Sequence, residues 1–149
     1  MNITTKKSGK EELIIVPITE KSDRKLAKKT NELFEKKKFT GKKLTNVYKQ
    51  GATDVLFIGA GEQVEADTIR KIAAIGAKKA KEEHMQEFAI DLQGMEMHVG
   101  AAIEGVYLGL YSYEEYKKRD KDAAKDPSKL TIITTSHVTQ QTIKDAKAI

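Results

Sequence analysis

The stretch Asp54 to Gly61, with the sequence DVLFIGAG, constrains the fold of this chain more than any other. Val55 to Ile58 form a continuous apolar run rather than an alternating one. A strand that is apolar on both faces must be covered on both, which is typical of a central strand in an α/β sheet. The run ends in Gly59-Ala60-Gly61, and a long helical pattern follows at once. This order of strand, glycine-rich turn and helix predicts a layered α/β domain.

Apolar periodicity places the other elements around this unit. It predicts strands near 3–5, 12–18, 44–49, 86–92 and 130–135, and helices near 22–39, 64–83, 99–110 and from 139 onward. The turn 50–53 is so short that strands 44–49 and 54–58 should pair antiparallel, which makes the sheet mixed but mainly parallel. Residues 112–128 are predicted to form a charged loop. The predicted core includes Val55, Phe57, Ile58, Ile72, Ile90, Ile103 and Val106.

Length and composition exclude several classes of protein. A chain of 149 residues is expected to form one domain, and it contains no cysteine for a disulfide or a thiolate metal site. The lack of cysteine is typical of a reducing cytoplasm, and from the sequence we expect neither a secretory signal nor a membrane span. The formal net charge is +5, with 27 Lys and Arg against 22 Asp and Glu. DNA binding remains an alternative, but interleaved charges favour a solvated lysine-rich surface.

The sequence offers weak candidates for a chemical site. Gly59, Ala60 and Gly61 could cradle a phosphate between a strand and a helix. A dinucleotide fingerprint needs a third glycine where Val64 stands, so a simple tight turn is favoured. The three histidines lack metal-ligand spacing and are expected at the surface; they are His84, His98 and His137. We therefore predict no catalytic residue, no metal ligand and no cofactor site in this chain.

The helix predicted over 99–110 is apolar nearly all round. One stripe carries large residues and another carries Ala101, Gly105 and Gly109, whose small size lets a second backbone approach closely. A helix of this kind is buried. Glu104 is its one charged residue. It is either a site carboxylate or, as we favour, a carboxylate at a domain edge that is paired to a nearby Lys or backbone N–H.

From 101 to 122 the chain resembles the leucyl aminopeptidase (cytosol aminopeptidase) family. The N-terminal domain of that family has a helix of the type Ala-x-x-Glu-Gly-x-x-Leu-x-x-Tyr, followed by an aromatic residue and then Tyr-Lys. VLFIGAGE is similar to a second family segment, with Glu62 in place of the usual Lys, and Phe39 to Lys43 match the segment before it. The helix motif falls on Ala101, Glu104, Gly105, Leu108, Tyr111, Tyr113, Tyr116 and Lys117.

The resemblance implies a fold and a parent activity. The fold is a three-layer α/β/α arrangement similar to macro domains. Members release N-terminal residues from peptides with two divalent metal ions, Zn or Mn, held in a C-terminal peptidase domain whose signature this chain lacks. Their N-terminal domain serves assembly into a hexamer and access to the active sites. The implied assembly or interdomain residues here are Glu104, Tyr111, Tyr113 and Tyr116.

These observations give a division of the chain and a leading function. Residues 1–138 are predicted to be a non-catalytic α/β domain, and 139–149 the start of a linker helix to an absent peptidase domain. The helical pattern stops on Ile149 without a terminating residue, so we expect the chain to be cut from a longer cytoplasmic protein. The alternatives are a macro-like module that binds ADP-ribose or another nucleotide through Gly59–Gly61, and a DNA-binding domain.

Overall fold

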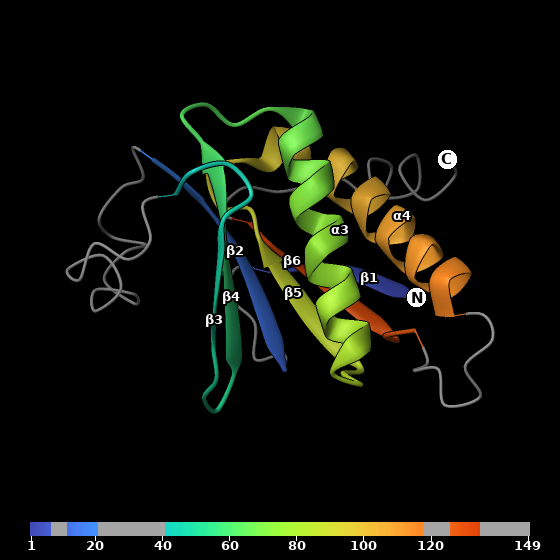
Figure 1. Ribbon diagram of the computed structural model, residues 1–149. Coiled ribbons are helices and arrows are strands. Elements are labelled where there is room, and N and C mark those ends of the chain that lie inside the picture. The colour runs from blue at the N-terminus through green and yellow to red at the C-terminus, as the bar shows by residue number, and fades with distance from the viewer. Residues whose placement is uncertain (7–11, 21–40, 118–125, 135–149) are drawn as a thin grey trace.

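The computed structural model describes residues 1–6, 12–20, 41–117 and 126–134. They form one six-stranded sheet with two long helices packed on one of its faces (Figure 1). The strands are β1 (Asn2–Lys6), β2 (Leu13–Thr19), β3 (Asn46–Lys49), β4 (Asp54–Gly61), β5 (Glu87–Asp91) and β6 (Lys129–Ile133). The helices are α3 (Ala66–Glu82), a short 3₁₀ helix (Glu96–His98) and α4 (Val99–Lys117).

The sheet has the strand order β1-β6-β5-β2-β4-β3. Four neighbouring pairs are parallel, and the edge strand β3 alone runs antiparallel, with Val47 opposite Phe57 of β4. The mixed, mainly parallel α/β sheet predicted from the sequence is therefore confirmed. β4 lies between β2 and β3, so it is an inner strand as expected, although the middle of the sheet is formed by β5 and β2.

Alternate residues of the strands build two separate cores. Leu56, Ile58 and Ala60 of β4 join the larger cluster, together with the inward faces of α3 and α4. Phe57 faces the other way and is buried with Val16 and Ile18 of β2. Because successive side chains of a strand point to opposite faces, an unbroken apolar run supplies both cores at once. Of the predicted core residues only Val55 departs, because it is half-buried at the margin of the smaller cluster.

Two of the predictions about local structure were wrong. α4 continues to Lys117, so residues 112–117 are helical rather than part of a loop. This segment, SYEEYK, lacks an apolar stripe, but Glu and Lys are good helix formers that extend a helix already started. Gly59-Ala60-Gly61 belongs to β4 and is not a turn; the chain bends after it, at Glu62 and Gln63.

Several predictions lie outside the described residues. They are the helices over 22–39 and from 139 onward, the linker assigned to 139–149, and His137. Within the described residues, α3 and α4 form a single helical layer on the sheet (Figure 1). No helix among them is long and apolar enough to cross a membrane.

Candidate functional site

The backbone of the glycine segment is already engaged. The N–H of Gly59 donates to the carbonyl of Thr45 at 2.7 Å, and the N–H of Gly61 donates to the carbonyl of Gly41 at 3.0 Å. A Cβ atom on Gly59 would lie 1.8 Å from the carbonyl oxygen of Lys42, which explains why glycine stands there. The segment 41–45 therefore occupies the position in which a phosphate would have to lie to accept hydrogen bonds from these N–H groups.

A pocket of about 480 Å³ opens beside this segment. It lies where the parallel strands β2 and β4 end and where α3 begins, and we call it the carboxyl-end pocket. Its charged lining residues are Glu20, Lys42, Lys43, Glu62 and Glu65, and all five are exposed. Ala60 and Gly61 contribute to its wall, so the glycine segment borders a pocket that the sequence alone did not reveal.

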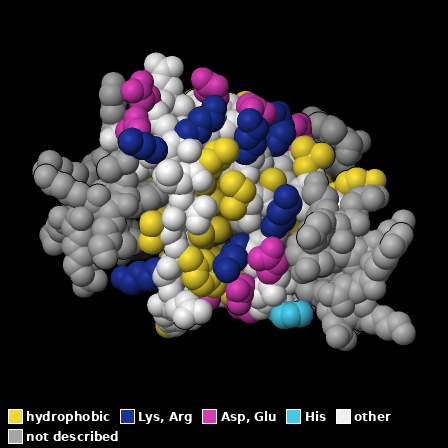
Figure 2. Space-filling view, in the orientation of Figure 1, with side chains coloured by type: hydrophobic (Ala, Val, Ile, Leu, Met, Phe, Trp, Pro, Cys, Tyr) yellow, Lys and Arg dark blue, Asp and Glu magenta, His cyan; other side chains and the backbone are white. Residues whose placement is uncertain are grey.

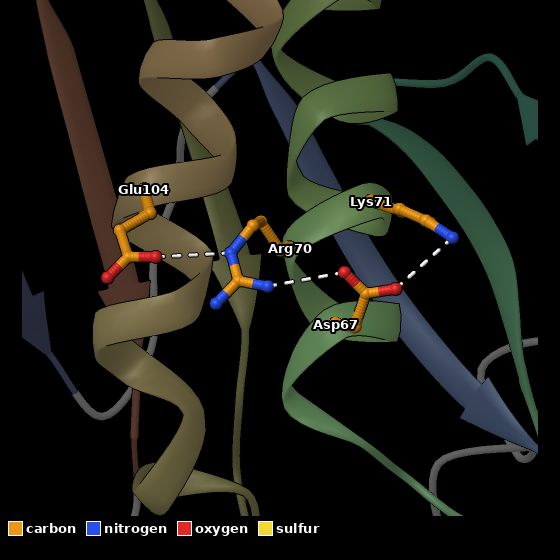
Figure 3. A network of polar contacts seen from close by, with 4 residues as sticks. All are labelled: Asp67, Arg70, Lys71 and Glu104. Atoms are coloured by element: carbon orange, nitrogen blue, oxygen red, sulfur yellow. Dashed lines mark hydrogen bonds and ion pairs between the residues drawn. The ribbon is translucent and has the colours of Figure 1, made fainter.

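Glu104 lies at the contact between the two helices. Its Oε2 accepts a hydrogen bond from Nε of Arg70 on α3 at 3.1 Å, and Arg70 also bonds Asp67 at 3.2 Å (Figure 3). Lys71 completes the network from the other side of Asp67 at 3.2 Å. Hydrogen bonding and attraction from Lys71, and then the charge of Arg70, lower the pKa of Asp67. Glu104 is thus a paired carboxylate, as we favoured from the sequence, but its partner is Arg70 rather than a lysine or a backbone N–H.

We expect the Arg70–Glu104 pair to contribute little to stability. Both side chains keep solvent contact, with exposed fractions of 33% and 25%. Pairs of this kind contribute about 0.2–1 kcal/mol, and less at high salt. A double-mutant cycle with Arg70→Met and Glu104→Gln, followed by urea unfolding, measures the coupling. A coupling energy above about 2 kcal/mol would contradict this assignment and indicate a buried role for Glu104.

The outward side of α4 carries exposed apolar groups. Met97, Leu108 and Tyr111 are 83%, 53% and 63% exposed, and they are the large exposed hydrophobic residues of the described chain. Met97 lies in the short 3₁₀ helix, two residues before α4 begins, while Leu108 and Tyr111 are three residues apart in α4, a spacing that makes them neighbours on the helix surface. Tyr113 and Tyr116 follow in the last turns of α4. Of the implied assembly residues, Tyr111 is thus one of the exposed apolar groups, and Glu104 lies on the same helix.

A second groove of about 270 Å³ separates β3 from α3. Tyr48 lines it and donates a hydrogen bond to Asp54, while Lys79 Nζ lies 4.6 Å from the centre of the Tyr48 ring. Burial, and then the hydrogen bond to Asp54, raise the pKa of Tyr48. Lys79 is also paired with Glu83 at 3.1 Å. These contacts hold the edge strand to the helix. The raised pKa makes the Tyr48 hydroxyl a weaker acid than an ordinary tyrosine.

The donor groups in the described ranges do not fit a pair of divalent metal ions. Within those ranges no group of three or more His, Asp or Glu residues comes close enough to hold a metal. His84 is exposed just after α3, and His98 is half-buried in the 3₁₀ helix. On the face shown in Figure 2, basic and acidic side chains alternate around a central apolar strip. That pattern is typical of a solvated surface rather than of a continuous basic track for DNA.

Comparisons with known proteins found a relative in sequence and several similar solved structures. A probable cytosol aminopeptidase of Persephonella marina is 30% identical over 134 residues, which cover 80% of this chain and 27% of that protein. A mutant of tomato leucine aminopeptidase superposes with a TM-score of 0.74 at 19% identity, covering 99% of this chain and 35% of that one. The bottromycin maturation enzyme BotP, in a complex with Mn, gives 0.63 at 18% identity over 93% of this chain and 29% of that one.

The two structural comparisons establish the fold alone, and the family is shown by a family model. The chain spans about a third or less of the length of each of these relatives. The model of the cytosol aminopeptidase family, N-terminal domain, matches residues 6–120, which include most of the sheet and both described long helices. The chain therefore belongs to the cytosol aminopeptidase family and corresponds to its N-terminal domain.

Proposed function

We propose that this chain is the non-catalytic N-terminal part of a leucyl aminopeptidase that removes N-terminal residues from peptides in the cytoplasm. The observation that carries the proposal is the match of residues 6–120 to the family's N-terminal domain. The length of the relatives supports the proposal, because most of each relative lies outside the region that this chain matches. Two divalent metal ions, Zn or Mn, would be held by a peptidase domain, and no reaction step is assigned to the residues described here.

An activity assay tests this proposal directly. The purified chain is incubated with a leucine anilide and Mn²⁺, beside tomato leucine aminopeptidase as the positive control. We expect turnover by the tomato enzyme and none by the chain, because the described residues lack a metal-binding cluster. Sustained turnover that disappears with a chelator would overturn the non-catalytic assignment.

We further propose that the apolar side of α4 contacts the peptidase domain. Leu108 and Tyr111 are more than half exposed, although Val99, Ile103 and Val106 on the opposite side of α4 are fully buried. Exposed large apolar groups gathered on one helix are typical of a docking surface. Glu104, one turn before Leu108 on α4, would border this contact, and the resulting two-domain subunit would assemble into a hexamer as the resemblance implies.

Binding to a separately produced peptidase domain tests the α4 surface. The chain is titrated by calorimetry into the Persephonella marina relative from which the matched region has been removed. We expect Leu108→Glu to weaken the binding at least tenfold, since it buries a charge at the contact. Glu82→Lys, an exposed change on α3, should have no effect. Equal binding by Leu108→Glu and the unmodified chain would place the contact elsewhere.

A further inference from the structure

The carboxyl-end pocket combines three features that usually accompany a ligand. Its position is the first, because ligands of open α/β sheets bind beyond the carboxyl ends of the strands. Here β2 ends at Thr19 and β4 at Gly61, and the N–H of Glu20 bonds the carbonyl of Gly61 at 3.0 Å, which joins the two strand ends. The pocket of about 480 Å³ lies at this junction.

The start of α3 supplies the second feature. This helix has 17 residues, and its N-cap, Glu65, makes no side-chain cap hydrogen bond. The first N–H groups of a helix have no partner within the helix, and they carry the positive end of its dipole. Glu65 and Thr68, which bracket the first turn, both line the pocket. The pocket therefore has hydrogen-bond donors suited to a carboxylate.

A buried hydroxyl group is the third and most specific feature. Thr68 is 1% exposed, lines the pocket, and its Oγ1 has no hydrogen-bond partner. A buried hydroxyl without a partner is costly, so its retention calls for an explanation. Thr4 and Thr131 also have unpartnered hydroxyls, but they are register partners on β1 and β6. Of these three threonines, Thr68 is the one that lines the carboxyl-end pocket.

The charges of the lining indicate the class of ligand. Lys42 and Lys43 bring two positive charges, while Glu20, Glu62 and Glu65 bring three negative ones. No ion pair joins any of these five side chains to another residue in the described ranges. A simple anion would meet the three carboxylates, and a simple cation would meet the lysines and the helix start. A small molecule that carries both charges can satisfy both sets.

We propose that the carboxyl-end pocket binds a free α-amino acid. The ligand's carboxylate receives hydrogen bonds from the start of α3, from the Thr68 hydroxyl and from Lys42 or Lys43. Its ammonium group donates to the carboxylates of Glu20 and Glu62. Free amino acids are the products of aminopeptidases, so a role in sensing product rests on the proposed function, whereas the binding itself does not.

Nuclear magnetic resonance titration of the chain with L-leucine tests the site. We expect L-leucine to shift the backbone amide signals of Gly61 and of residues 66–68. N-acetyl-leucine lacks the ammonium group and leucinamide lacks the carboxylate, so each should bind at least tenfold more weakly. Equal binding of N-acetyl-leucine would identify an anion site and overturn the proposal. Absence of shifts at millimolar L-leucine would overturn it as well.

Matched threonine variants tie the binding to the buried hydroxyl. Thr68→Val keeps the shape of the side chain and removes the hydroxyl, so it should weaken L-leucine binding at least tenfold while the chain stays folded. Thr131→Val removes an equally buried, unpartnered hydroxyl on β6 and should leave the binding unchanged. Unaltered binding by Thr68→Val would refute the assignment. The titration needs no peptidase activity, so its failure and that of the proposed function are distinguishable.

Discussion

Replacing Gly105 with alanine is expected to destabilise the fold, whereas the same replacement at Gly100 is expected to stabilise it. A Cβ atom on Gly105 would lie 2.1 Å from the carbonyl oxygen of Arg70, a backbone atom of α3 that cannot turn aside. A Cβ on Gly100 would meet nothing within 4 Å. The two glycines lie in the same helix, so helix propensity favours alanine at both, by up to about 1 kcal/mol.

At Gly105, packing against α3 outweighs helix propensity, so the expected change in stability is a loss. Gly109, one turn further on, would place its Cβ 2.5 Å from the carbonyl oxygen of Ala74, so α3 and α4 approach along a line of two glycines. Separating the helices to admit a side chain would cost about 1–3 kcal/mol or more, with Gly105→Leu worse than Gly105→Ala. Urea unfolding measures the midpoints. A raised midpoint for either Gly105 variant would show that the helices do not meet there.

The close approach of another backbone to α4 could be predicted from the sequence, because the small residues that permit it lie close together in the chain. Gly105 and Gly109 stand four residues apart, and such spacing places both on one side of a helix. The same reasoning located α3 within two residues of its observed bounds. It failed at residues 112–117, because helix continuation there depends on propensity and on an existing nucleus rather than on an apolar stripe.

The carboxyl-end pocket could not be predicted from the sequence, because the residues that form it are far apart in the chain. Its residues come from the end of β2, the segment before β3 and the start of α3, which only the folded chain brings together. Gly59 shows the same limit. The sequence suggests that a turn requires glycine at this position. In the structure glycine is required because the carbonyl oxygen of Lys42 lies where a Cβ atom would be. Tertiary contacts of this kind leave no periodic signal in the sequence.

Phe57→Ala is expected to cost about 3–5 kcal/mol of unfolding free energy, because it empties the centre of the smaller core. Phe57 is 3% exposed and is buried with Val16 and Ile18 on the face of the sheet opposite to α3 and α4. Among the described residues the cluster consists of aliphatic side chains around Phe57, which are too small to fill the space that the ring leaves. Domains of this size are stable by about 5–15 kcal/mol, so the loss is a large share of the total.

Val55→Ala provides the matched control for Phe57→Ala. Val55 lies on the same strand and the same face, two residues earlier, but it is only half-buried. Its truncation should cost about 1 kcal/mol, because less apolar area is removed from the core and no closed cavity forms. Urea unfolding of both variants separates burial from strand propensity. If Phe57→Ala cost no more than Val55→Ala, the second core would not be sealed, and β4 would be covered on one face alone.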